Sequence, residues 1–202
     1  MSGPIGILAL QGAYAKHGEL LDCLGVRWQA VKTAAALDDC AALILPGGES
    51  TAMTRLLEPD GLLERLRVFA QGRPVLGTCA GLILMGRSGD ARAASLGILD
   101  VQVERNAFGR QVRSFQARLD LDLGGEGAEF PATFIRAPRI VQAGAAVEVA
   151  GRWRGEPVLV AQGPHLGMSF HPELSGDPRI HAWWLRRIAA RTPREGRTVA
   201  VS

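Results

Sequence analysis

Three short apolar runs, each followed closely by glycine, constrain the possible folds of this chain more than any other feature of its sequence. The runs are IGILAL at 5–10, AALILPGG at 41–48 and PVLGTCAG at 74–81. Aliphatic runs of this length without alternating polarity are typical of strands that are buried on both faces of a sheet. The three runs therefore predict neighbouring strands inside a mostly parallel sheet.

Helical periodicity lies between these apolar runs. We expect helices near 16–24, over 50–71 with an interruption at 59–61, and over 82–87. Strands that alternate with helices indicate an open α/β fold with a central sheet flanked by helices. In such folds ligands bind beyond the carboxyl ends of the strands.

The second half of the chain has a different pattern. Short segments, several of alternating polarity and separated by turn residues, predict added antiparallel strands at 97–105, 111–121, 132–138, 145–153 and 157–163, and a final strand is expected at 166–170, leading into His171. A last helix is expected to begin with Asp177 as its N-cap and Pro178 at its first helical position. Because no repeat or linker interrupts the sequence, we expect a single domain over 1–202, with a frayed tail at 192–202.

The composition argues against several classes of function. The formal net charge is only +3, and basic residues are scattered among acidic and apolar ones, so we expect no nucleic-acid partner. The N-terminus has neither a basic region nor a long apolar run, so we expect no signal peptide and no membrane span. Cys23, Cys40 and Cys79 fit neither a disulfide framework nor a metal motif. A reducing cytoplasm is therefore expected, with Cys23 and Cys40 as packing residues.

Cys79 has unusual neighbours. It lies in the pattern G-x-C-x-G, formed with Gly77 and Gly81, between a predicted strand and a predicted helix. Small residues at these positions are typical of the tight turn that presents a nucleophile in α/β hydrolases. Lowering the pKa of a thiol from its usual 8.5 to about 7 requires roughly 2 kcal/mol, which a helix N-terminus and a nearby imidazolium can supply. The alternative is that Cys79 is one more buried packing residue.

His171 is the best candidate for the base that activates this thiol. It follows a predicted buried strand and opens the sequence His171-Pro172-Glu173. If this segment is extended, residues two apart point to the same side, so Glu173 can hold one ring nitrogen while the other faces Cys79. We expect His181 to be structural and assign no role to His17 or His165. In isolation, the HPE sequence could equally be a polar turn.

A third glycine-rich stretch, LPGGEST at 45–51, also follows a buried strand. Glycines there expose backbone N–H groups, which can stabilise the oxyanion of an acyl-transfer reaction. We assign the oxyanion hole to the N–H groups of Gly48 and of Ala80, the residue after the candidate nucleophile. The alternative for Pro46-Gly47-Gly48 is an ordinary turn.

Together these residues resemble the class I (triad) glutamine amidotransferases, with Cys79, His171 and Glu173 as the triad. More local matches resemble one family within that class, the glutaminase subunits of pyridoxal 5′-phosphate synthase. They are LALQGAYAKH at 8–17, LPGGEST at 45–51, GTCAGLIL at 77–84, VERNAFGRQ at 103–111, FIRAP at 134–138 and SFHPEL at 169–174. The chain departs from the family at Ala107, at Pro164-His165 and in the loop 87–95, none of which touches the triad.

The resemblance implies a flavodoxin-like fold and hydrolysis of L-glutamine to L-glutamate and ammonia. The ammonia would pass to a synthase subunit that builds pyridoxal 5′-phosphate, and no cofactor or metal is expected. The implied substrate-binding residues are Gly47, Gly48, Glu49, Arg105, Ile135 and Arg136. An arginine would meet the substrate's α-carboxylate, and Glu49 would lie near its α-ammonium. The resemblance also implies that synthase binding reorders the Gln11-Gly12 loop and the Gly47-Gly48 peptide.

Other functions remain open at this stage. The triad alone does not distinguish a glutaminase of vitamin B6 biosynthesis from one that serves histidine or anthranilate biosynthesis. A stand-alone hydrolase of γ-glutamyl compounds would use the same residues without a partner. An inactive binding subunit would keep the fold, although the intact set of Cys79, His171 and Glu173 argues against it.

Overall fold

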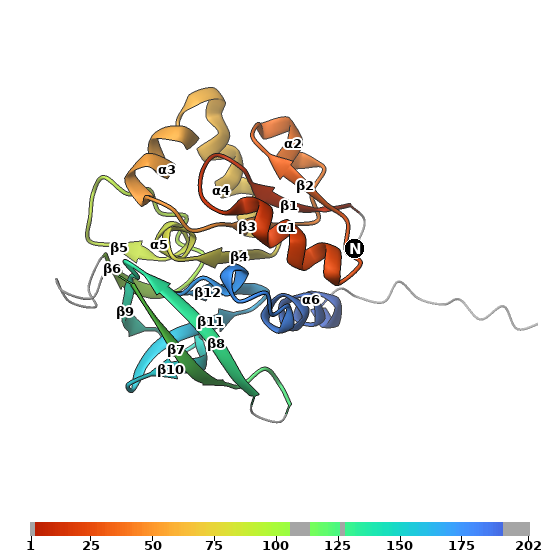
Figure 1. Ribbon diagram of the computed structural model, residues 1–202. Helices are drawn as coiled ribbons and strands as arrows, with labels where there is room; N and C mark the ends of the chain where they lie inside the picture. The colour runs from red at the N-terminus through yellow and green to blue at the C-terminus, as the bar shows by residue number, and fades with distance from the viewer. Residues whose placement is uncertain (1–2, 106–113, 126–127, 192–202) are drawn as a thin grey trace, which may run out of the picture.

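The computed structural model describes residues 3–105, 114–125 and 128–191. Within these ranges the main sheet has nine strands in the order β2-β1-β3-β4-β12-β11-β10-β7-β8, and a smaller sheet has the order β5-β6-β9 (Figure 1). The strands from β2 to β12 pair in parallel, whereas those from β12 to β8 pair antiparallel. The parallel half carries most of the helices, and the antiparallel half extends away from them and ends in the long hairpin of β7 and β8.

The elements of the first half alternate between strand and helix. In chain order they are β1 (Ile5–Leu8), α1 (Tyr14–Cys23), β2 (Trp28–Val31), α2 (Ala34–Asp38), β3 (Ala42–Leu45), α3 (Ser50–Leu57), the 3₁₀ turn η1 (Pro59–Gly61), α4 (Leu62–Gly72), β4 (Val75–Thr78) and α5 (Ala80–Met85).

The second half is mostly strands. It comprises β5 (Arg87–Ser88), β6 (Val101–Glu104), β7 (Ser114–Leu121), β8 (Ala128–Ile135), β9 (Arg139–Ala143), β10 (Glu148–Trp153), β11 (Glu156–Gln162), β12 (His165–Met168), the 3₁₀ turn η2 (Pro172–Leu174) and α6 (Arg179–Arg191).

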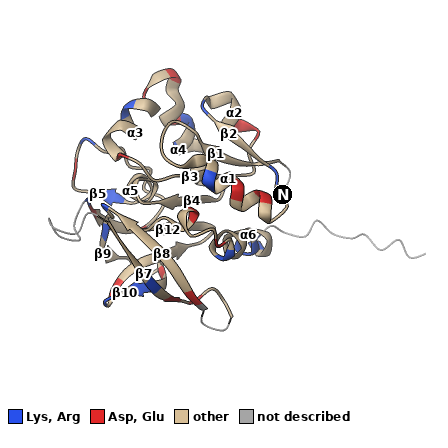
Figure 2. Cartoon of the chain, viewed as in Figure 1, with Lys and Arg blue, Asp and Glu red and all other residues tan. Residues whose placement is uncertain are grey.

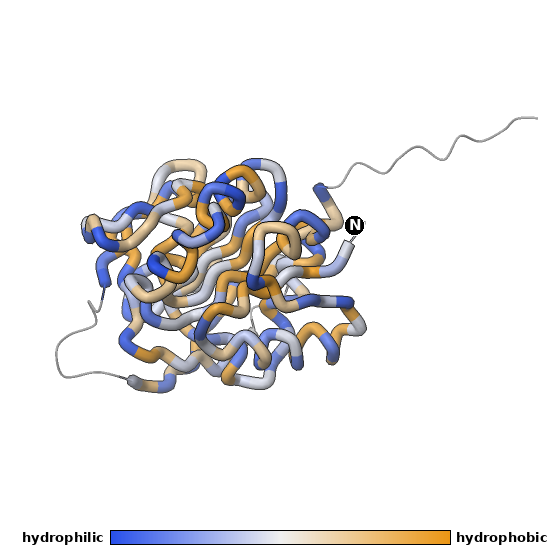
Figure 3. Tube along the Cα trace, turned by 90° about the horizontal axis from the view of Figure 1, so that it is seen from above, coloured by the Kyte–Doolittle hydropathy of each residue, from blue (hydrophilic) through white to orange (hydrophobic). Residues whose placement is uncertain are grey.

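Two apolar cores lie on opposite faces of the main sheet. On one face Ile7 and Ile44 pack with Leu21 of α1 and Trp184 of α6. On the other face Leu43 packs with α2, α3, α4 and α5. Figure 3 shows the apolar segments inside the fold and the hydrophilic ones along the outer turns, and Figure 2 shows charged residues spread over the helices and hairpins rather than on the central strands. None of the helices in the described ranges has the length and apolarity needed to cross a membrane.

The expected α/β architecture is confirmed. The three apolar runs form β1, β3 and β4, which are fully buried and shorter than the runs themselves. The long helical stretch is interrupted where expected, at η1, and Asp60 there has a φ of 58°. The elements β2, α2, β5 and β9 were not predicted. Cys40 is buried, but Cys23 is exposed, so its assignment to packing is wrong.

The second half also consists mainly of strands, as expected, but the bounds of β6 and β8 differ from the expected 97–105 and 132–138. The last helix changes as well. Helix α6 begins at Arg179 rather than Pro178, and Asp177 Oδ1 accepts a hydrogen bond from the backbone N–H of Arg179 at 3.0 Å. Most of the 103–111 motif, including Ala107, and the predicted frayed tail lie outside the described residues.

Candidate active site

The candidate catalytic residues follow three strands that are neighbours in the sheet. β3, β4 and β12 lie side by side and pair in parallel, with Leu45 opposite Gly77 and Met168 opposite Thr78. Their carboxyl ends therefore meet at one edge of the sheet. This arrangement places the loop after β3, the turn at Cys79 and the segment at His171 next to one another.

Cys79 occupies a strained turn between β4 and α5. Its φ of 49° and ψ of −103° lie outside the regions that residues other than glycine usually adopt. Its backbone N–H donates to Met168 O at 2.9 Å, which fixes the turn against β12. Strain of this kind gathers at functional sites, where the surrounding structure holds it. The expectation of a tight strand-to-helix turn at Cys79 therefore agrees with the structure.

The two glycines of the pattern let α5 lie unusually close to the sheet. A Cβ atom on Gly81 would collide with the carbonyl and Cβ of Leu45, at the end of β3. A Cβ atom on Gly77 would collide with Met85 and with the backbone of Gly81. Both positions therefore require glycine because the backbones of β3, β4 and α5 are in close contact.

His171 and Glu173 form a buried ion pair. His171 Nδ1 lies 2.7 Å from Glu173 Oε1, and the backbone N–H of His171 donates to Thr133 O at 2.8 Å. Pro172–Leu174 is a 3₁₀ turn, so the expected extended segment is wrong, although the carboxylate still reaches the ring. Nδ1 is thus occupied, which leaves Nε2 for Cys79.

The positive charge of His171 and the negative charge of Glu173 stabilise each other. Burial lowers the pKa of His171, but hydrogen bonds with Cys79 and Glu173 and their negative charge raise it to about 10. Burial likewise raises the pKa of Glu173, yet the hydrogen bond with His171 holds it below its usual value. His171 is therefore an imidazolium at neutral pH, which favours the thiolate of a neighbouring cysteine.

A pocket of about 140 Å³ opens beside Cys79 and His171. Of the residues expected to bind substrate, Gly48, Glu49, Arg105, Ile135 and Arg136 line it. Gly47 does not; it lies against the imidazole of His171, where a Cβ atom would collide with the ring.

The expected oxyanion donors are only partly at the pocket. Gly48 lines the pocket, whereas Ala80 does not. As the first residue of α5, Ala80 has a backbone N–H without an intrahelical acceptor. Gly48 has a φ of 153°, a conformation that L side chains rarely adopt.

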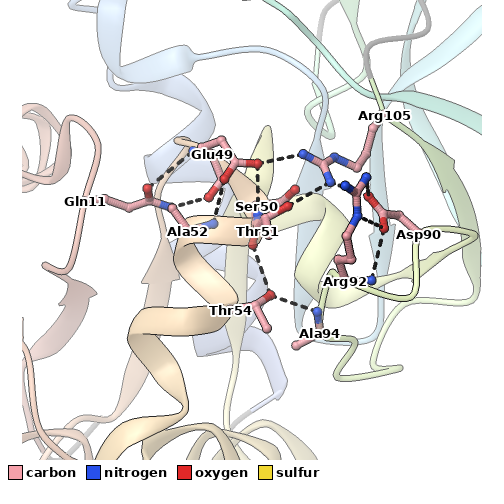
Figure 4. A network of polar contacts seen from close by, with 10 residues as sticks. All are labelled: Gln11, Glu49, Ser50, Thr51, Ala52, Thr54, Asp90, Arg92, Ala94 and Arg105. Atoms are coloured by element: carbon pink, nitrogen blue, oxygen red, sulfur yellow. Dashed lines mark hydrogen bonds and ion pairs between the residues drawn. The ribbon is translucent and has the colours of Figure 1, made fainter.

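Glu49 and Arg105 form an ion pair with each other (Figure 4). Glu49 caps α3 by accepting from the N–H groups of Thr51 and Ala52, and its Oε1 lies 2.6 Å from Arg105 Nη2. Arg105 also pairs with Asp90 and donates to Thr51 Oγ1 at 3.0 Å. Two carboxylates thus hold the guanidinium of Arg105.

Arg136 differs from Arg105 in its surroundings. Its φ of 42° is again unusual for a residue other than glycine. It lines the pocket, and its guanidinium has no hydrogen bond or ion pair with any residue that the structure describes. Within the described part of the chain, its donors are therefore not engaged.

Comparisons with known proteins agree with this geometry. Residues 7–190 match the model of the SNO glutamine amidotransferase family. The chain belongs to this family. It is 48% identical to "Pyridoxal 5'-phosphate synthase subunit PdxT" of Pelotomaculum thermopropionicum, over 91% of this chain and 94% of the relative. It is 47% identical to the protein of the same name from Haemophilus ducreyi, over 91% of this chain and 96% of the relative.

Solved structures show the same fold. A crystal structure described as a glutamine amidotransferase aligns with a TM-score of 0.86 and 42% identity, covering 93% of this chain and all of the other. A structure described as a GMP synthase component from Thermoplasma acidophilum aligns with a TM-score of 0.67 at 16% identity, covering 95% of this chain and 96% of the other. The second match bears on the fold alone.

Four residues around the site of this family member were not predicted from the sequence. Ser50 and Ile83 line the pocket, and Ser50 Oγ is buried without a hydrogen-bond partner in the described part of the chain. Asp90 pairs with Arg105, and His17 lies beside Glu173. Ser50, Ile83 and His17 lie within the quoted motifs, but only the fold brings them beside residues that are far apart from them in the sequence.

Proposed function

We propose that this chain is the glutaminase subunit of a pyridoxal 5′-phosphate synthase, with Cys79, His171 and Glu173 as its catalytic residues. The observation that carries the proposal is the imidazole of His171, held by Glu173 and lining the same pocket as Cys79. Membership of a glutamine amidotransferase family supports the reaction, and the name shared by the two relatives supports the pathway.

The reaction follows from these groups. The Cys79 thiolate attacks the side-chain carboxamide carbon of glutamine, and the negative charge moves to the carboxamide oxygen. When the C–N bond breaks, the His171 imidazolium gives its proton to the nitrogen, which leaves as ammonia. His171 then takes a proton from water, which attacks the thioester. The C–S bond breaks, and glutamate and the thiolate are released.

Free glutamine brings an α-carboxylate and an α-ammonium into the pocket. We assign the α-carboxylate to Arg136, whose donors are unoccupied among the described residues, with Arg105 as a second positive charge. Glu49 supplies negative charge for the α-ammonium, although it shares that charge with Arg105. The N–H groups of Gly48 and Ala80 are assigned to the oxyanion.

Partner binding is proposed to complete the oxyanion hole. Gln11 is bonded to the backbone of Glu49 through both of its amide atoms, with Nε2 2.8 Å from Glu49 O and Oε1 3.4 Å from Glu49 N. Gly12 lies against the carbonyl of Gly47 so closely that a Cβ atom would collide with it. A synthase that moves the Gln11-Gly12 loop would therefore also move the Gly47-Gly48 peptide.

A glutamate-release assay tests the reaction. Wild type and Cys79→Ala are compared, each with and without the synthase subunit. We expect wild type with synthase to release glutamate and Cys79→Ala to release none above background. Release by Cys79→Ala at the wild-type rate would reject the catalytic assignment.

The same assay separates the remaining alternatives. Stimulation by the pyridoxal 5′-phosphate synthase subunit, but not by synthases of histidine or anthranilate biosynthesis, is expected. An equal rate with and without any synthase would instead indicate a stand-alone hydrolase. No turnover under any condition, with no covalent labelling of Cys79 by a glutamine-analogue electrophile, would indicate an inactive binding protein.

A further inference from the structure

A line of buried polar side chains continues behind the ion pair of His171 and Glu173. His17 of α1 and His181 of α6 are both 0% exposed, and Glu173 is 2% exposed. His17 Nε2 lies 3.4 Å from Glu173 Oε2, and His17 Nδ1 lies 2.9 Å from His181 Nε2. The line therefore runs from His171 through Glu173 and His17 to His181, across three separate segments of the chain.

The two atoms at the junction have complementary chemistry. Within the described part of the chain, neither His17 Nε2 nor Glu173 Oε2 has a hydrogen-bond partner, although the two atoms lie 3.4 Å apart. A buried polar atom without a partner is costly, and a buried carboxylate oxygen needs a donor. A slight approach that lets an N–H on His17 Nε2 donate to Glu173 Oε2 would satisfy both atoms at once.

The charge of Glu173 then determines the proton positions along the line. An ionised carboxylate only accepts, so His17 must carry its proton on Nε2. His17 remains neutral because burial, more than any other influence, lowers its pKa to about 4. Its Nδ1 is therefore an acceptor, and His181 Nε2 must be the donor to it. Burial also lowers the pKa of His181, so this imidazole is neutral as well.

We infer that His17 is a positioning residue for the triad, which donates a hydrogen bond to Glu173 Oε2 and so holds Oε1 on His171, and that His181 fixes the tautomer of His17. This inference rests on the proposed function, because it requires Cys79, His171 and Glu173 to act together. It explains why two helices that line one core both place histidine where an aliphatic side chain would fill the space.

The inference predicts a pH effect with a definite sign. The charged and titratable groups that face Glu173 are His171 and His17, and those that face His17 are Glu173, His171 and His181. Without the donor on Oε2, the Glu173 carboxyl takes up a proton at higher pH, and the imidazolium of His171 loses its charge partner. The acidic side of the pH–activity profile should therefore move to higher pH.

Paired amide substitutions test the donor with little change in polarity. In His17→Gln the amide nitrogen can reach the position of Nε2, whereas in His17→Asn it reaches only that of Nδ1. With the synthase subunit present, we expect His17→Asn to lower kcat by about tenfold, as for a lost hydrogen bond to a charged group, with little change in KM. The acidic midpoint of the pH–activity profile of His17→Asn should lie about one pH unit higher than that of wild type. His17→Gln should stay within about threefold of wild type.

A second readout needs neither glutamine nor synthase. The rate of alkylation of Cys79 by iodoacetamide, followed on the Cys79 peptide by mass spectrometry, reports the thiolate and imidazolium pair directly. Its pH profile should shift upward in His17→Asn and not in His17→Gln, and His181→Asn and His181→Gln should show the same contrast more weakly. Circular dichroism checks that each variant is folded.

The outcomes separate this inference from the proposed function. If the Asn and Gln variants of His17 behave alike in both readouts, the donor role is wrong and the histidines are packing residues. If Cys79→Ala releases glutamate as wild type does, the proposed function fails, while the alkylation profiles still decide whether His17 acts through Glu173.

Discussion

Arg105 and Arg136 both line the pocket, but only Arg105 is engaged in ion pairs among the described residues. The guanidinium of Arg105 is held between Glu49 and Asp90, and it anchors the loop 87–95 to the start of α3 (Figure 4). Arg136 contacts no hydrogen-bonding partner among the described residues. A substrate carboxylate can bind Arg136 without displacing an existing ion pair, whereas binding to Arg105 must compete with two carboxylates.

We therefore expect Arg136→Ala to raise the KM for glutamine by about 10- to 100-fold, the equivalent of losing a hydrogen bond to a charged group. The effect on kcat should be smaller, because the residue binds the end of the substrate that does not react. Arg136→Lys keeps the positive charge but loses the planar guanidinium, so its KM should lie between those of wild type and Arg136→Ala. Steady-state kinetics with saturating synthase gives both constants, and an unchanged KM in Arg136→Ala would reject the assignment.

A residue near the site could be predicted from the sequence only if its motif, rather than a distant contact, places it there. That Cys79, His171 and Glu173 lie close together was predictable because each lies in a short motif at the end of a strand, and parallel strands bring such ends together. The pairing of Asp90 with Arg105 and of His17 with Glu173 depends on how loops and helices pack in three dimensions. The spacing of these residues along the chain does not predict those contacts.

Among the elements, α5 is the one whose position most directly controls the nucleophile. It begins at Ala80, immediately after Cys79, and its first turn touches the end of β3 through Gly81. The close approach aligns the N-terminus of the helix with the loop after β3, which contains Gly48. Any side chain at position 81 must push the two apart.

Gly81→Ala should therefore destabilise the protein by about 1–3 kcal/mol, as overpacking usually does. The matched control is Gly72→Ala at the end of α4, where a Cβ atom meets nothing within 4 Å. That change should be neutral or stabilising by about 0.4–1 kcal/mol, since alanine restricts the unfolded chain. Urea unfolding followed by circular dichroism measures both, and equal stabilities for the two variants would contradict the close-packing argument.

The elements that sequence analysis missed are short. β2 has only four residues, of which Trp28 and Gln29 are partly exposed, so it lacks the continuous apolar run that marks β1, β3 and β4. α2 has five residues, too few for a helical period to be visible. η2 is a 3₁₀ turn because Pro172 opens it, and the sequence indicated only that the residue before proline is extended.

At the scale of the whole molecule, the buried histidines link stability to pH. His17 has its pKa lowered to about 4 in the folded protein, mainly by burial, and about 6.5 is expected when it is unfolded. His165 has a similar shift for the same principal reason. Between these values the unfolded chain binds more protons than the folded one, so stability falls as the pH falls.

The free energy of unfolding should therefore decrease as the pH falls from about 6.5 to about 4. His17 alone should account for roughly 3 kcal/mol over this window. The raised pKa of His171 acts at higher pH, where it makes stability fall as the pH rises above about 6.5. Urea unfolding at pH 6.5 and pH 4.5 therefore measures the loss due to His17. The variant His17→Gln should show a smaller one, and an identical pH dependence would contradict the linkage.

The strand that leads to His171 comes much later in the chain than Cys79, yet β12 lies in the middle of the sheet, between β4 and β11. A ribosome therefore delivers the proposed nucleophile before the proposed base. Until β12 inserts, a growing polypeptide, or one shortened by proteolysis before β12, holds Cys79 without the imidazole of His171. We expect such a fragment to have no glutaminase activity, so that ammonia forms only once β12 has taken its place in the sheet.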